Sequence, residues 1–193
     1  MRSIVALGAL TIALLVGGCG SHETHDADAA PTSTASSTPG ATVNAADEMF
    51  AVMMIPHHEQ AVEMADLVPT RTTNPDLLAL AAAIKGAQDP EITQMQGWLG
   101  TWGTDVAATG DHASHGGMAG MQSAQTLSEL AALKDDAFDD RWMEMMIDHH
   151  EGAITMAKDV IAQGSDPAVR TLAEQVITAQ QAEIEQMTGM LGG

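Results

Sequence analysis

The chain has 193 residues, which suits one ordinary domain or two very small ones. Its 7 basic and 26 acidic residues give a formal net charge of −19, which argues against nucleic-acid binding because phosphate recognition needs a basic surface. A single cysteine excludes an intramolecular disulfide, a cysteine-based zinc site and an iron–sulfur cluster. The 14 methionines are the unusual feature, and they either fill a core or bind a soft metal ion.

Residues 1–18 predict a lipoprotein signal peptide. Arg2 precedes an apolar run, Ile4 to Val16, which is too short to cross a bilayer and is typical of an export signal. The sequence LVGGC that ends at Cys19 resembles a bacterial lipobox, in which the cysteine is lipidated. We therefore expect an extracytoplasmic protein, in the periplasm or on the outer cell surface, that is anchored to the membrane only by a lipid on Cys19.

Two further segments follow the signal peptide. Residues 19–46 are rich in Ser, Thr, Ala, Pro and Asp and show no apolar periodicity, so they predict a disordered tether. Residues 47–193 predict one domain with an internal repeat, because residues 47–100 match residues 139–192 at a constant offset of 92 positions. The match is densest where Met-Met-Ile-x-His-His-Glu begins at Met53 and again at Met145.

Each repeat predicts two helices joined by a turn. Asp47 suits the N-cap of the first helix, while Pro75 and Pro167 suit the first turn of the second helix in each repeat. No segment alternates apolar and polar residues over a useful length, so we expect no sheet. The linker 101–134, with a short helix near 127–133, is long enough to run the length of the helices. The prediction is an all-α, ferritin-like four-helix bundle of two hairpins with a long crossover, and its first and third helices are antiparallel.

The first helix of each repeat places histidines among methionines. On a helical wheel His57 shares the apolar face with Met53 and Met64, and the repeat does the same with His149. One interpretation is a methionine-rich core that holds a satisfied histidine, and the other is a metal site. The candidate metal ligands are Met53, Met54, His57, His58 and Met64 in the first repeat, and Met145, Met146, His149, His150 and Met156 in the second.

Helix geometry predicts how these ligands combine. Met53 and His57 are one turn apart and can share an ion, as can Met54 and His58. If the antiparallel helices cross near Gln60 and Gly152, residues of one repeat come level with residues of the other. This register predicts two equivalent sites, one of Met53, His57 and Met156 and the other of Met145, His149 and Met64.

The second helix of each repeat carries polar residues on its apolar face. A buried glutamate that faces a buried histidine would orient the imidazole so that its other nitrogen can bind a metal. The alternative is that the helix rotates and exposes Glu91 and Glu183. The candidate supporting residues are Gln88, Glu91 and Met95, with Gln180, Glu183 and Met187 in the repeat.

The ligand types favour copper. Thioether and imidazole without thiolate suit Cu(I) first and Cu(II) second. A di-iron site of the ferritin type needs Glu-x-x-His pairs, which the chain lacks, and Val62 and Ile154 stand where a zincin motif needs its second histidine. The linker residues His112, His115, Met118 and Met121 form either a copper-capture segment or an ordinary glycine-rich loop.

The paired Met-Met-Ile-x-His-His-x-x-Ala-x-x-Met motifs resemble the bacterial family known as domain of unknown function 305. The resemblance covers residues 47–193. It implies a ferritin-like helical bundle, export from the cytoplasm and, in some members, copper binding linked to copper tolerance. It also implies that the metal ligands lie among the methionines and histidines of the two motifs.

Three functions are compatible with these features. The first is a cell-envelope lipoprotein that binds copper for sequestration, tolerance or delivery to a copper-handling partner. No nucleophile–base pair is visible in the sequence, so we expect a binding protein and not an enzyme. The alternatives are a ferritin-like metal oxidase and a metal-free helical interaction module.

Overall fold

The computed structural model describes residues 42–104 and 118–192, and every regular element in these ranges is an α-helix. The helices are α1 (Ala45–Arg71), α2 (Pro75–Trp102), α3 (Ala124–Ala132), α4 (Asp135–Gln163) and α5 (Pro167–Leu191). The all-α prediction is confirmed, and four of the helices correspond to the two repeats. The signal peptide, Cys19, most of the tether, His112 and His115 lie outside the described residues.

Local sequence signals set most of the helix ends. Asn74 and Asp166 cap α2 and α5, and the prolines that follow them occupy the first turn as expected. Helix α1 begins earlier than predicted, because Asn44 is the N-cap and Asp47 completes a capping box from the third helical position. The helix also continues through Pro56, whose ring removes one backbone hydrogen bond without ending the helix.

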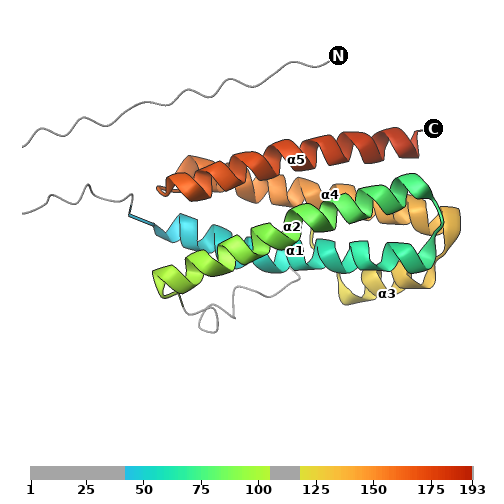
Figure 1. Ribbon diagram of the computed structural model, residues 1–193, viewed down its shortest axis with the longest axis horizontal. Coiled ribbons are helices and arrows are strands. Elements are labelled where there is room, and N and C mark those ends of the chain that lie inside the picture. Colours follow the sequence, from blue (N-terminus) through green and yellow to red (C-terminus); the bar gives the residue numbers. More distant parts are fainter. Residues whose placement is uncertain (1–41, 105–117, 193) are drawn as a thin grey trace, which may run out of the picture. The chain divides into compact units, whose positions relative to one another are not determined.

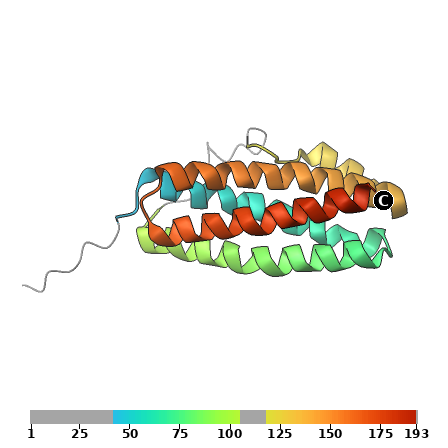
Figure 2. The same ribbon diagram turned by 90° about the horizontal axis from the view of Figure 1, so that it is seen from above.

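The four long helices lie side by side as two hairpins, α1 with α2 and α4 with α5 (Figures 1 and 2). Helix α1 is antiparallel to α4, as predicted, and contacts at both ends demonstrate this. The Asn44 side chain donates to the Gln163 carbonyl at 2.9 Å near one end, and the Trp142 indole donates to the Met64 carbonyl at 2.8 Å toward the other. The short helix α3, at the end of the crossover, packs against α1 and α4.

The core consists of two apolar clusters, one toward each end of the helices. One combines Met64 and Val68 of α1 with Trp142 and Met145 of α4. The other combines residues of α1 that precede His57, such as Phe50, with residues of α4 that follow His150. The four histidines of α1 and α4 therefore occupy the positions between the two clusters. None of the described helices is long and apolar enough to cross a membrane.

Candidate metal centre

Four histidines are fully buried where α1 crosses α4. His57 and His58 of α1 and His149 and His150 of α4 all have an exposed fraction of 0%. The rings of His57 and His149 face each other, with 3.7 Å between their centroids and 37° between their planes. The first histidine of each repeat therefore meets its counterpart in the other repeat, at the point where the two helices are level.

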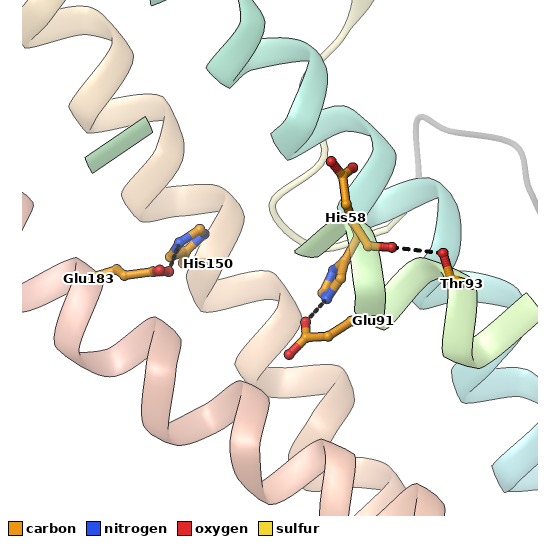
Figure 3. Close-up of polar contacts among 6 residues, drawn as sticks. His58, Glu91, Thr93, His150 and Glu183 are labelled. Atoms are coloured by element: carbon orange, nitrogen blue, oxygen red, sulfur yellow. Dashed lines mark hydrogen bonds and ion pairs between the residues drawn. The ribbon is translucent and has the colours of Figure 1, made fainter. Parts of the chain in front are cut away.

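The second histidine of each repeat is paired with a carboxylate. The distance from His58 Nε2 to Glu91 Oε2 is 2.8 Å, and the distance from His150 Nε2 to Glu183 Oε2 is 2.7 Å (Figure 3). The glutamate side chains are only 19% and 17% exposed, so the alternative in which the helices rotate to expose them is wrong. Each pair joins the two helices of one hairpin, and the carboxylate fixes the orientation of the imidazole ring.

The other residues predicted to support the histidines also face inward. Met95 and Met187 are fully buried, and Gln88 and Gln180 are 2% and 3% exposed. Neither amide atom of Gln88 has a hydrogen-bond partner among the described residues. Helices α2 and α5 therefore bury the face that carries these residues.

Several imidazole nitrogens have no partner within the described part of the chain. These atoms are Nδ1 of all four histidines and Nε2 of His149. An unpartnered polar atom in the interior costs about 1–3 kcal/mol. A metal ion that accepts the nitrogen lone pair would satisfy such an atom, so these rings fit a metal-binding role.

Burial also determines the charge of the inner histidines. It lowers the pKa of His57 from 6.5 to about 3; repulsion from His58 and His150 adds to this effect, and the Ala119 carbonyl opposes it. The pKa of His149 is likewise well below 6.5, through burial first and then through repulsion from His57, His150 and His58. Both rings are therefore neutral near pH 7, and the neutral imidazole is the form that binds metals.

The segment 118–122 covers the inner histidines. Sequence reasoning named only its methionines, Met118 and Met121, as candidates for copper capture and did not predict this contact. The distance from His57 Nε2 to the Ala119 carbonyl oxygen is 3.2 Å. The Gln60 side chain donates to the Gln122 carbonyl at 2.9 Å and accepts from the Gln122 backbone N–H at 2.7 Å. The repeat did carry a signal for this contact, because Gln60 directly follows the shared His-His-Glu of its motif, whereas the second motif has Gly152 at this position.

Glycine permits the close approach of this segment to α4. A Cβ atom on Gly152 would lie 2.0 Å from the Ala119 carbonyl oxygen. Gly120 has a φ of +79°, and a Cβ atom there would lie 2.5 Å from the Asp148 carbonyl oxygen. The segment therefore packs directly on the backbone of α4 beside His149.

The methionines of the two motifs lie in two kinds of environment. Met54, Met64, Met145 and Met146 are buried in the apolar clusters. Met53 and Met156 are partly buried, and both line a cavity of about 240 Å³ between α1 and α4. Of the linker candidates, Met118 is buried and Met121 lines a groove of about 600 Å³ beside α1 and α3.

The predicted grouping of ligands around each histidine needs correction. His57 is level with His149, so the helices cross at these residues and not at Gln60 and Gly152. Met156 is seven residues beyond His149, about 10 Å along α4, and is therefore not level with His57. The symmetric prediction for Met64 and His149 fails for the same reason. Across residues 42–104 and 118–192, no three His, Cys, Asp or Glu side chains form a metal-binding group.

Comparisons with known proteins identify the family. Residues 47–191 match the family described as domain of unknown function DUF305, and the chain belongs to this family. A crystal structure of a DUF305 protein from Streptomyces coelicolor, provisionally described as secreted, is 29% identical with a TM-score of 0.70; the match covers 76% of this chain and 92% of that one.

A second group of similar structures is that of CopM. The Cu(II)-bound form of CopM is 33% identical with a TM-score of 0.65, over 76% of this chain and 95% of CopM. Cu(I)-bound and silver-bound forms of CopM match at similar levels. An uncharacterised protein of Acanthamoeba polyphaga mimivirus is 34% identical over 84 residues, and this match spans only 55% of the viral protein.

Proposed function

We propose that this protein binds copper, Cu(I) in preference to Cu(II), at the histidines and methionines where α1 crosses α4. The observation that carries the proposal is the set of buried imidazoles, among them the neutral rings of His57 and His149, with unpartnered nitrogens between methionine-rich clusters. Imidazole and thioether without thiolate suit copper. Cu(I)- and Cu(II)-bound structures of CopM, about 30% identical to this chain, support the same chemistry.

The four histidines would contribute to the site in two ways. His58 and His150 hold a carboxylate through Nε2, which leaves Nδ1 available to a metal ion. His57 and His149 face each other, and within residues 42–104 and 118–192 neither is paired with a carboxylate. They would bind the ion with their unpartnered nitrogens. The nearby thioethers would favour the monovalent state, because soft sulfur ligands select Cu(I).

We further propose that the protein acts at the cell envelope and has a ferritin-like arrangement of its four long helices. In this proposal Cys19 carries the lipid, residues 19–46 form the tether, and the helical domain sequesters copper or delivers it to a copper-handling protein. The relative provisionally described as secreted supports export. A Cys19→Ala variant should move the protein from the membrane fraction to the soluble extracytoplasmic fraction, and retention of the variant in the membrane would contradict the anchor.

The copper site is tested by anaerobic titration of the protein with Cu(I) in competition with a chromogenic chelator. We expect the wild type to bind more tightly than micromolar. A His57→Gln/His149→Gln variant should bind more than about 100-fold more weakly, because loss of a direct ligand should exceed the 10–100-fold effect of an outer partner. Glu59→Gln/Glu151→Gln is the matched control, since both glutamates are exposed and directly follow the histidine pairs. Wild-type binding weaker than micromolar would overturn the proposal.

We propose that the protein binds copper and does not turn it over. Oxygen consumption after addition of Cu(I) to the aerobic protein distinguishes these roles. A stoichiometric reaction that stops after one equivalent supports binding. Sustained consumption that requires His57 and His149 would show a metal oxidase.

A further inference from the structure

The cavity between the first half of α1 and the last half of α4 has an unusual lining. Three of its residues are methionines: Met49 and Met53, which are one turn apart on α1, and Met156, which faces them from α4. Met49 is 41% exposed, and the other two are partly buried. The cavity, of about 240 Å³, is therefore lined by thioethers that solvent reaches from the side of Met49.

We infer that this cavity is a second metal site, specific for soft monovalent cations such as Cu(I) and Ag(I). Thioether sulfur is a soft ligand that favours Cu(I), whereas Cu(II) and Zn(II) prefer imidazole or carboxylate ligands. The lining contains no histidine, and Asp159 is its only charged residue. The negative charge of Asp159, and of the chain as a whole, attracts cations toward the cavity.

The internal repeat shows that packing alone does not require this cavity. The residue that corresponds to Phe50, which lines the cavity, is Trp142. Trp142 is fully buried, and its indole donates to the Met64 carbonyl, so a larger ring occupies the equivalent position at the other end. Arg141 stands where the first repeat has Met49. An open set of three thioethers therefore belongs to one end of the molecule only.

The position of the cavity gives it a role in the proposed copper function, on which this inference rests. Met53 is one turn before His57, so the cavity adjoins the buried histidines along α1. An ion held by Met49, Met53 and Met156 is at the surface but next to the buried site. The three thioethers of the cavity favour Cu(I) over Cu(II), which makes the cavity an access site that selects the oxidation state.

The test uses the full chain and two probes, Cu(I) under anaerobic conditions and Ag(I), which needs no reductant. Met49→Leu/Met156→Leu removes two thioethers with little change in volume and leaves Met53 in place. We expect this variant to bind one equivalent fewer of each ion and to bind Cu(II) as the wild type does. Met190→Leu is the control, because Met190 is also partly buried but packs at the other end of the core.

A second variant closes the cavity without removal of sulfur. Phe50→Trp introduces the residue that the second repeat has at this position, and it should also abolish one equivalent of Ag(I) binding. Methionine methyl NMR provides a direct readout, since Ag(I) should shift the signals of Met49 and Met156 but not that of Met190. If Phe50→Trp does not fold, the double leucine variant and the NMR spectra decide.

The outcomes separate this inference from the proposed function. If the wild type binds no Cu(I) more tightly than micromolar, both fail. If the wild type binds Cu(I) but Met49→Leu/Met156→Leu keeps the same stoichiometry and affinity, only the cavity site is overturned. A separate thioether site is supported if Met49→Leu/Met156→Leu loses one equivalent of bound Cu(I) and the His57→Gln/His149→Gln variant retains that same equivalent.

Discussion

His57 and His149 are fully buried and neutral, and for this reason acid lowers the free energy of unfolding. The pKa of His57 is about 3 in the folded protein and near 6.5 in the unfolded chain. Between these values the unfolded state binds more protons, so the free energy of unfolding falls as the pH decreases from about 6.5 toward 3. Above pH 6.5 the contribution of His57 to stability is complete.

We therefore predict that the metal-free protein loses stability on mild acidification. His57 alone should contribute about 1.4 kcal/mol for each pH unit below 6.5, and His149 acts in the same direction. Urea unfolding at a series of pH values between 7.5 and 4.5, with a chelator present, measures this slope. The slope measures how many protons the chain takes up on unfolding, and in His57→Gln this number should decrease by about one. An unchanged slope would contradict the low pKa of His57.

The glutamates behind the outer histidines make a separate prediction. Glu91→Gln/Glu183→Gln keeps the size of both side chains but removes the charge that orients His58 and His150. Copper affinity should fall about 10–100-fold, the usual effect of an outer hydrogen-bond partner of a metal-binding histidine. Competition titration measures the affinity. The exposed pair Glu59→Gln/Glu151→Gln should bind copper as the wild type does, and an equal loss in both variants would point to overall charge instead.

At the scale of elements, periodicity and turn residues predict the helices, their pairing into hairpins and the antiparallel direction of α1 and α4. They do not predict the register between these helices. Register depends on contacts between helices, such as the Trp142 indole on the Met64 carbonyl and Asn44 on the Gln163 carbonyl. A pattern along one helix contains no information on these contacts, so it wrongly predicts Met156 level with His57.

The contact between segment 118–122 and α4 can be tested at Gly152. Gly152→Ala places a methyl group 2.0 Å from the Ala119 carbonyl oxygen, so the segment must move away from His57. Overpacking of this kind costs about 1–3 kcal/mol. Gly97→Ala is the control, because nothing lies within 4 Å of a Cβ atom there and alanine favours the helix. Thermal unfolding should show a lower midpoint for Gly152→Ala and an equal or higher one for Gly97→Ala.

At the scale of the whole molecule, an aspartate in the first helix of each repeat accepts hydrogen bonds from the interhelical turn of the other repeat. Asp47 of α1 accepts hydrogen bonds from the backbone N–H groups of Ser165 and Asp166 in the α4–α5 turn. Its counterpart Asp139 of α4 accepts from the side chains of Thr72 and Asn74 in the α1–α2 turn. The sequence suggested only a helix cap for Asp47, because the partner turns are more than 60 residues away.

Asp47 should therefore be important for stability. Burial by itself raises the pKa of Asp47, but the hydrogen bonds from Asn44, Ser165 and Asp166 lower it below 3.8. The contribution of Asp47 to stability is therefore present above pH 3.8. It is lost as the pH falls through the pKa that Asp47 has in the folded protein. Asp47→Ala leaves the part-buried N–H groups of Asn44, Ser165 and Asp166 without their carboxylate partner and should cost about 1–3 kcal/mol. Asp66→Ala, which removes an exposed ion pair with Lys85, should cost less than about 1 kcal/mol. Urea unfolding at pH 7 compares the two, and equal losses would contradict the role of Asp47.

These reciprocal contacts have a consequence for the order of events during synthesis. The buried carboxylate of Asp47 gains its turn partners only after residues 165 and 166 have left the ribosome, when most of the chain has been made. The α1–α2 hairpin therefore emerges long before it can complete its own contacts. The export proposed above would benefit from this delay, because a chain that folds late is still unfolded when it reaches the membrane.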